Sequence, residues 1–176
     1  MAVLPIVIAP LPVLSARARE IQPHEFGPEL ATLASDMAET MYAAPGVGLA
    51  APQVNDGRRL IVIDSSSGDE RGTRLFRMAN PSITARGDET IEWQETCLSV
   101  PEIEVWVTRA KHITVNWQDP ATGEAMTEDF EEYEAVIVQH ELDHLEGTVL
   151  LDRVSSFKRG RWVRKMKKVR QAIPAK

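Results

Sequence analysis

The sequence predicts an α+β fold, in which mostly antiparallel sheets pack around a central helix, with an N-terminal helix and a C-terminal helix. Three observations predict it: an apolar stripe at helical spacing near the N-terminus, strand-like stretches in the middle, and two long helical stretches at the end. The 176 residues fit one domain, residues 1–176, with a substantial core. A composition of 43% apolar and 26% charged residues is that of a globular protein, which excludes a disordered or fibrous chain.

The first expected helix covers residues 28–44. Pro28 suits a first helical turn, and the dipeptide Pro45-Gly46 ends the stretch. Its apolar side chains recur at helical spacing and predict one buried face: Leu30, Leu33, Met37 and Met41.

The next expected elements are two strands and two helices. Residues 58–64 indicate a buried strand, and residues 112–117 alternate as in a half-buried one. The central helix is expected over 127–147, because its start is acidic and Gly147 suits a C-terminal stop. The last helix is expected over 154–171, capped by Ser155 or Ser156.

The central helix carries the pattern His-Glu-x-x-His. On a helix, residues four apart share a face, so His140 and His144 can bind one metal ion. Glu141 is then placed to reach a metal-bound water rather than the metal. The pattern is short and occurs by chance, so an exposed polar helix face is an equal alternative at this point.

Two histidines leave a tetrahedral site incomplete, and the third ligand must be Asp, Glu, His or Cys. His24 and His112 are available, but their surroundings indicate nothing. Cys97 is the only cysteine and lies between a polar stretch and a predicted strand. A lone cysteine is often a small buried hydrophobe, yet a nearby metal would make it a thiolate ligand. Two histidines and one cysteine leave a position for water, as in a catalytic site.

A third stretch, GVGLAAPQV at 46–54, has two glycines that let the backbone approach a ligand closely. Gln53 adds an amide that can donate a hydrogen bond. Taken alone, this stretch is better explained as a tight turn that ends the first helix.

Together the three stretches resemble the peptide deformylase family, whose members remove the N-formyl group from nascent bacterial polypeptides. The family motifs G-x-G-L-A-A-x-Q, E-G-C-L-S and Q-H-E-x-D-H-L-x-G read here, in the same order, GVGLAAPQ (46–53), ETCLS (95–99) and QHELDHLEG (139–147). The similarity extends over nearly the whole chain. It implies a metal-dependent hydrolase of N-formylmethionyl peptides, acting in protein biosynthesis.

The resemblance also implies residue roles. One divalent ion would be bound by Cys97, His140 and His144: Fe²⁺ in the cell, with Zn²⁺, Ni²⁺ or Co²⁺ able to replace it. A metal-bound hydroxide would attack the formyl carbon, and Glu141 would carry the proton to the departing amine. The oxyanion would be held by the metal, the Gln53 amide and the backbone N–H of Leu98.

Further residues follow from the same resemblance. Those expected to contact the peptide are Gly48, beside its backbone, and Val47, Val136 and Ile137, around its first side chain, usually methionine. Arg109 is expected to pair with Glu95 and to support the loop of Cys97.

Thr96 departs from the family, whose motif has glycine at this position. A β-branched residue resists positive φ and adds bulk beside the substrate path, so we expect Thr96 to lower activity or change peptide preference. This supports one alternative, a diverged deformylase-like paralogue that keeps the metal and has altered or reduced activity. A second alternative is a zinc peptidase with the same His-Glu-x-x-His chemistry, against which Cys97 and Gln53 argue.

Charge is unevenly distributed. Residues 157–176 carry nine Lys or Arg and no acid, whereas the whole chain is at −6, which leaves −15 for residues 1–156. The basic C-terminal helix and tail, 154–176, are either a solvated helix face or, as in the family, a contact with the ribosome. The apolar N-terminus lacks a basic start and is broken by prolines, so we expect no membrane contact, a cytoplasmic location and, from the family, a monomer.

Overall fold

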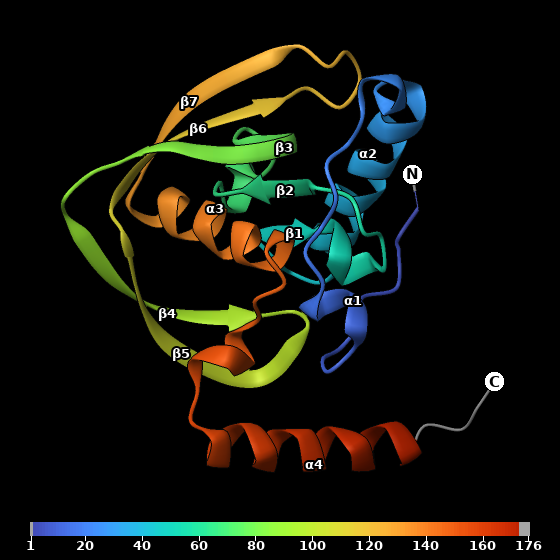
Figure 1. The fold of residues 1–176 in the computed structure, drawn as a ribbon, viewed down its shortest axis with the longest axis vertical. Helices are drawn as coiled ribbons and strands as arrows, with labels where there is room; N and C mark the ends of the chain where they lie inside the picture. The colour runs from blue at the N-terminus through green and yellow to red at the C-terminus, as the bar shows by residue number, and fades with distance from the viewer. Residues whose placement is uncertain (1, 173–176) are drawn as a thin grey trace.

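The structure, a computed structural model, describes residues 2–172 and is built from two antiparallel sheets with a helix between them (Figure 1). The larger sheet has the strand order β1-β2-β3-β6-β7, and the smaller one pairs β4 with β5. The strands are β1 Gly48–Ala50, β2 Leu60–Asp64, β3 Leu75–Arg86, β4 Thr90–Cys97, β5 Val100–Ala110, β6 His112–Gln118 and β7 Ala125–Glu131. The helices are α1 Pro12–Ser15, α2 Pro28–Ala43, α3 Glu132–Leu145 and α4 Ser156–Ala172. The α+β prediction is therefore confirmed.

Helix α3 lies between the two sheets, and its whole central part is buried. One side packs on the larger sheet through an apolar cluster that includes Ile61, Ile113, Phe130 and Val138. The β4–β5 hairpin covers another side, below α3 in Figure 1. A helix enclosed in this way holds its side chains in fixed positions, which is what a site built on it requires.

Helix α2 packs on β1 and β2 at one end of the larger sheet. The predicted stripe is confirmed, because Leu30, Met37 and Met41 are fully buried and Leu33 is partly buried. The predicted strands at 58–64 and 112–117 appear as β2 and β6.

The prediction of a helix over 127–147 is wrong at its start. Residues 125–131 form strand β7, which pairs with β6 along its full length. Phe130 explains the difference, since it is fully buried against the rings of Phe76 and Trp117. The helix begins at Glu132 with an acidic first turn, and Gly147, at φ +76°, follows its end as expected.

Helix α4 begins at Ser156, and Ser155 caps its first turn, because its Oγ accepts a hydrogen bond from the backbone N–H of Lys158 at 3.3 Å. The helix lies along the β4–β5 hairpin on the side away from α3 (Figure 1). Of the predicted basic tail, residues 173–176 lie outside the described residues. Among those described, no helix is both long enough and apolar enough to cross a membrane.

Candidate active site

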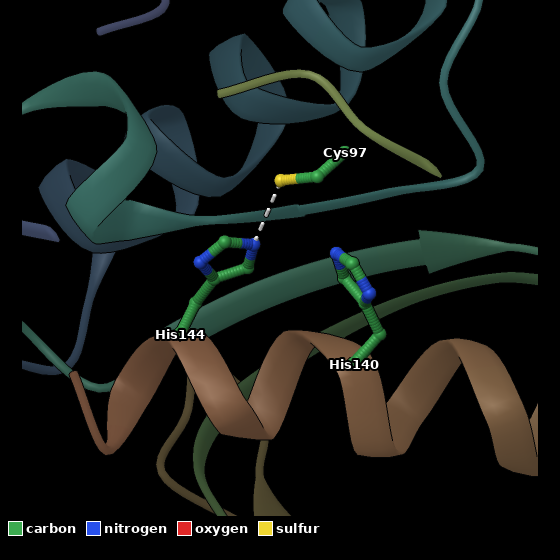
Figure 2. Close-up of side chains that lie close together, drawn as sticks. All are labelled: Cys97, His140 and His144. Carbon is green, nitrogen blue, oxygen red and sulfur yellow. Dashed lines mark hydrogen bonds between the residues drawn. The ribbon is translucent and has the colours of Figure 1, made fainter. Parts of the chain in front are cut away.

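The two histidines of α3 and Cys97 of the hairpin meet at the centre of the molecule. Figure 2 shows both imidazole rings pointing from α3 toward the Cys97 thiol. The Sγ atom lies 3.3 Å from Nε2 of His144, and one donor atom from each residue falls within 4.8 Å of the others. In the described part of the chain, this is the group of side chains with the spacing of a metal site.

Cys97 is placed by the end of the β4–β5 hairpin. The register shifts between Glu95 and Cys97, so Thr96 falls at an irregularity of the strand pairing, and Leu98-Ser99 form the turn. Two contacts fasten this turn. The Ala9 N–H donates to the Ser99 carbonyl at 2.9 Å, and Gln53 Nε2 donates to Ser99 Oγ at 3.1 Å.

His140 is oriented by a buried carboxylate. Its Nδ1 lies 2.7 Å from Oε2 of Glu95, which leaves Nε2 for a ligand, the arrangement typical of metal-binding histidines. Arg109 holds Glu95 with two hydrogen bonds of 2.7 and 2.8 Å, and both side chains are buried. Burial by itself raises the pKa of Glu95, but hydrogen bonds from Arg109 and His140 outweigh it and lower this pKa to about 2.

The two histidines differ in protonation. Burial lowers the pKa of His144 well below its usual value, so its ring is neutral and has a lone pair to offer. Burial also lowers the pKa of His140, but its hydrogen bonds with Cys97 and Glu95 reverse this and raise it. A metal ion would compete with that proton for the same ring nitrogen.

The surroundings of the cluster fit a cation. In the described part of the chain, two buried side-chain atoms have no hydrogen-bond partner, Glu141 Oε2 and His144 Nδ1. The Glu141 oxygen lies beside the cluster, although buried polar atoms are nearly always paired, whereas His144 Nδ1 is the ring nitrogen opposite the Nε2 that faces Cys97. Two imidazoles and one thiol are also a donor set that divalent transition metals prefer. The residues present therefore fit such an ion.

Glu141 lies directly against strand β1. A Cβ atom at Gly48 would come within 2.2 Å of Glu141 Oε1, so only glycine leaves room for this carboxylate. Burial raises the pKa of Glu141 to about 7, with smaller opposing and reinforcing effects from the charges of His140 and Glu95. A carboxylate with such a pKa is a stronger base than an ordinary glutamate.

Gln53 is fully buried, and its side-chain orientation is fixed. Its Oε1 accepts from the Ala50 N–H at 2.8 Å, which turns Nε2 toward Ser99 and to 3.7 Å from the sulfur of Cys97. Residues 46–54, which on their own suggested only a tight turn, thus place the amide donor of Gln53 at the cluster.

A cavity of about 800 Å³ opens in front of the cluster, between the hairpin and α3. Its lining includes every remaining residue expected to contact the peptide: Val47, Gly48, Thr96, Leu98, Val136 and Ile137. Thr96 is exposed to the cavity and does not have positive φ, so its expected backbone strain is absent and its bulk remains. Glu134, in the first turn of α3, binds Arg74 at 2.9 Å and does not line this cavity.

Two aromatic residues of the cavity were missed from the sequence. Trp93 of β4 and Tyr133 of α3 stack at 5.0 Å between ring centroids, with their planes tilted by 33°. Tyr133 precedes Val136 and Ile137 by three and four residues, so helical spacing was a signal that could have found it. Trp93 lies two residues before Glu95 on one strand face, a weaker signal.

The chain is similar to known proteins over nearly its whole length. The sequence profile of the family described as Polypeptide deformylase matches residues 3–160. A peptide deformylase of Desulfotalea psychrophila is 42% identical over 168 residues, covering 96% of this chain and 97% of its own. One from Desulfosudis oleivorans is 44% identical over 174 residues, with 98% of each chain covered. The crystal structure of peptide deformylase from Ehrlichia chaffeensis superposes with a TM-score of 0.87 at 33% identity, over 97% of this chain and 98% of that one.

Proposed function

This chain belongs to the polypeptide deformylase family, and from that premise we propose that Cys97, His140 and His144 hold the divalent ion of its reaction. The chain is a deformylase, a hydrolase that removes the N-formyl group from the formylmethionyl ends of nascent polypeptides. One observation carries the residue assignment: three donor atoms converge within 4.8 Å, beside a buried carboxylate oxygen that has no partner. Neither the paralogue nor the zinc peptidase alternative is favoured by any similarity found.

When bound, the ion would act as a Lewis acid that lowers the pKa of water and polarises the formyl oxygen. Glu141 is the proposed general base, because its unpaired Oε2 is buried beside both histidines. It would accept a proton from the attacking water and deliver it to the departing amine nitrogen. Gly48 supports this role by leaving room for the carboxylate.

The negative charge that develops on the formyl oxygen requires fixed donors. We assign this role to the Gln53 amide, which lies 3.7 Å from the Cys97 sulfur, and to the backbone N–H of Leu98, the next residue of the cavity wall. Glu95 and Arg109 would act behind them by fixing the ring of His140.

The apolar part of the cavity suits the first side chain of the peptide. Val136 and Ile137, which are almost fully buried, line it together with Val47. Gly48 would allow the peptide backbone to approach β1. Thr96 is exposed on the same wall, and we keep the proposal that it restricts the peptide.

We propose Fe²⁺ as the native ion, with Zn²⁺, Ni²⁺ or Co²⁺ as substitutes, because one thiolate and two imidazoles accept all four. We also propose a monomeric, cytoplasmic enzyme whose residues 1–176 form one domain. Support for one domain comes from α3, which packs on strands of both sheets.

The test is formate release from formyl-Met-Ala-Ser by protein purified anaerobically with Fe²⁺. We expect turnover that is lost in Glu141→Ala, and an ion content near one per chain that falls in Cys97→Ser. Turnover that persists in Glu141→Ala would refute the assigned base. Full ion content in Cys97→Ser would refute the thiolate ligand.

We propose a ribosome contact for α4. Its exposed side chains include the cations Lys158, Arg159, Arg161, Arg164, Lys165 and Lys168. Two of these are neutralised, Arg159 by Asp152 and Lys165 by Glu102, so the others are available to phosphate groups. Charge reversal at Arg161, Arg164 and Lys168 should weaken co-sedimentation with ribosomes, and unchanged co-sedimentation would refute the contact.

A further inference from the structure

We propose that helix α4 is part of the active-site architecture, with Trp162 and Lys165 as positioning residues that hold the segment 101–104 of the cavity wall. Through this segment they would also hold the turn of Cys97. The inference rests on the metal site proposed above. The inference goes beyond that metal site, because Trp162 and Lys165 follow residues 3–160, the part of the chain that the family profile matches.

The first observation is the packing of α4 on the hairpin. Trp162 and Met166, four residues apart on one helix face, are only 5% and 7% exposed. They belong to the same apolar cluster as Cys97, Val100 and Ile103. A displacement of this helix face therefore reaches the ligand turn through contiguous packed side chains.

The second observation is a specific hydrogen bond. Nε1–H of Trp162 donates to the Pro101 carbonyl at 2.7 Å. Pro101 follows Val100, which pairs directly with Cys97 across the hairpin. The indole thus fixes the backbone within a few residues of the thiol, from the side opposite to α3.

The third observation concerns Glu102, which has a left-handed backbone at φ +64° although it is not glycine. Such a conformation persists where the surroundings hold it. Lys165 of α4 forms an ion pair with the Glu102 carboxylate. Two successive residues of the wall, Pro101 and Glu102, are therefore each bound by α4.

These contacts matter for the site because the other side of the same segment lines the cavity. Pro101, Glu102, Ile103 and Glu104 form part of its wall, and Lys158 of α4 reaches its edge. The hairpin itself is a two-stranded sheet, which on its own is marginally stable. We infer that α3 and α4 together give this hairpin the rigidity that a metal ligand and a substrate wall require.

The experiment compares Trp162→Phe and Lys165→Ala with the wild-type, Fe²⁺-loaded full chain. Phenylalanine keeps the buried ring and removes only the N–H donor. Lys167→Ala is the matched control, an exposed lysine on the same helix. The measurements are kcat and KM for formyl-Met-Ala-Ser, the rate of ion loss to a chelator, hydrogen exchange over 95–104 in chelator-treated protein, and the midpoint of urea unfolding.

We expect Trp162→Phe to lower kcat/KM and to accelerate ion loss by about 3- to 10-fold, the effect of one lost hydrogen bond. Lys165→Ala should change both by about 2- to 5-fold, because its ion pair with Glu102 is exposed. Hydrogen exchange over 95–104 should accelerate in both, and Lys167→Ala should match wild type. A lower unfolding midpoint with unchanged ion loss, exchange and KM would overturn the proposal, leaving α4 a purely stabilising helix. A failure of the metal site itself is distinguished by Cys97→Ser, which would then retain its ion.

Discussion

Helix α3 borders two cavities, one of about 800 Å³ in front, between the helix and the hairpin, and one of about 860 Å³ behind. The front cavity is lined by Glu141, whose buried Oε2 has no hydrogen-bond partner. The rear cavity is lined by five arginines: Arg17, Arg59, Arg86, Arg109 and Arg153. Its volume and charge would suggest a binding site as readily as the front cavity does.

The polar groups behind α3 are, however, satisfied by one another. Glu146 binds Arg17 and Arg59, and Asp143 binds Arg109 and Arg153. The Gln139 amide accepts from Arg86 and donates to the carbonyls of Ala110 and Ala135. An unsatisfied buried polar atom, rather than cavity volume or charge, therefore distinguishes the front side of α3, where the reaction is proposed, from its rear, structural side.

The largest effect should follow from removing the unpaired carboxylate. Glu141→Gln keeps the volume of the side chain but cannot accept the proton, so kcat should fall about 10²- to 10⁴-fold. Arg86→Ala, on the rear side, should leave kcat within twofold. Both are measured by formate release, and comparable losses in the two variants would contradict the division between the two sides.

The next largest effect should be a loss of folding stability when an ion pair on the rear side of α3 is broken. Arg109→Met leaves the buried Glu95 carboxylate without its main partner, which should reduce the free energy of unfolding by about 3 kcal/mol. Arg153→Ala removes a more exposed partner of Asp143 and should cost about 1 kcal/mol or less. Urea unfolding measures both, and equal losses would show that burial does not set the importance of these pairs.

A smaller effect is expected where the front side meets β1. Gly48→Ala places a methyl group against the Glu141 carboxylate, the movable end of a side chain. Stability should therefore change little, while the displaced base should lower kcat about 10- to 100-fold. Activity and urea unfolding are measured together. A loss of stability without a loss of kcat would show that Gly48 serves packing alone.

The last effect is a pH dependence in the free energy of unfolding of chelator-treated protein. Burial raises the pKa of Glu141 from 4.5 in the unfolded chain to about 7. The folded state then binds more protons between these values, so its stability falls as the pH rises through this range. Glu141→Gln lacks this penalty and should be more stable than wild type by about 1–3 kcal/mol at pH 8. This gain in stability should shrink at pH 5. An equal gain at both pH values would contradict a raised pKa of Glu141 in the folded state.

Much of this architecture was accessible from the sequence. The stripe of α2, strands β2 and β6, and the α+β class follow from local periodicity, which the structure retains. The grouping of Cys97 with His140 and His144 was also accessible, because metal chemistry limits the ligands and the chain has one cysteine. Their roles as ligands stay a prediction.

Other features depend on contacts between distant segments, which local patterns do not encode. Acidic residues before Tyr133 suggested a helix start, yet Phe130 enters the core and makes the stretch a strand. The stacking of Trp93 on Tyr133 joins residues 40 positions apart. The docking of Trp162 on Pro101 is another example, since the basic sequence of α4 indicated only a solvated face or an external contact.

The distribution of the three donors has a consequence for folding. Two of them lie on α3, inside the core, and the third lies on the small two-stranded sheet. An ion bound to all three would act as a cross-link between a stable unit and a weakly self-supporting one. Its loss should free the hairpin to open locally while α3 and the larger sheet stay folded. Amide hydrogens of β4 and β5 should then exchange faster than those of β2 and β3 once the ion is removed, and binding of the ion should slow them selectively.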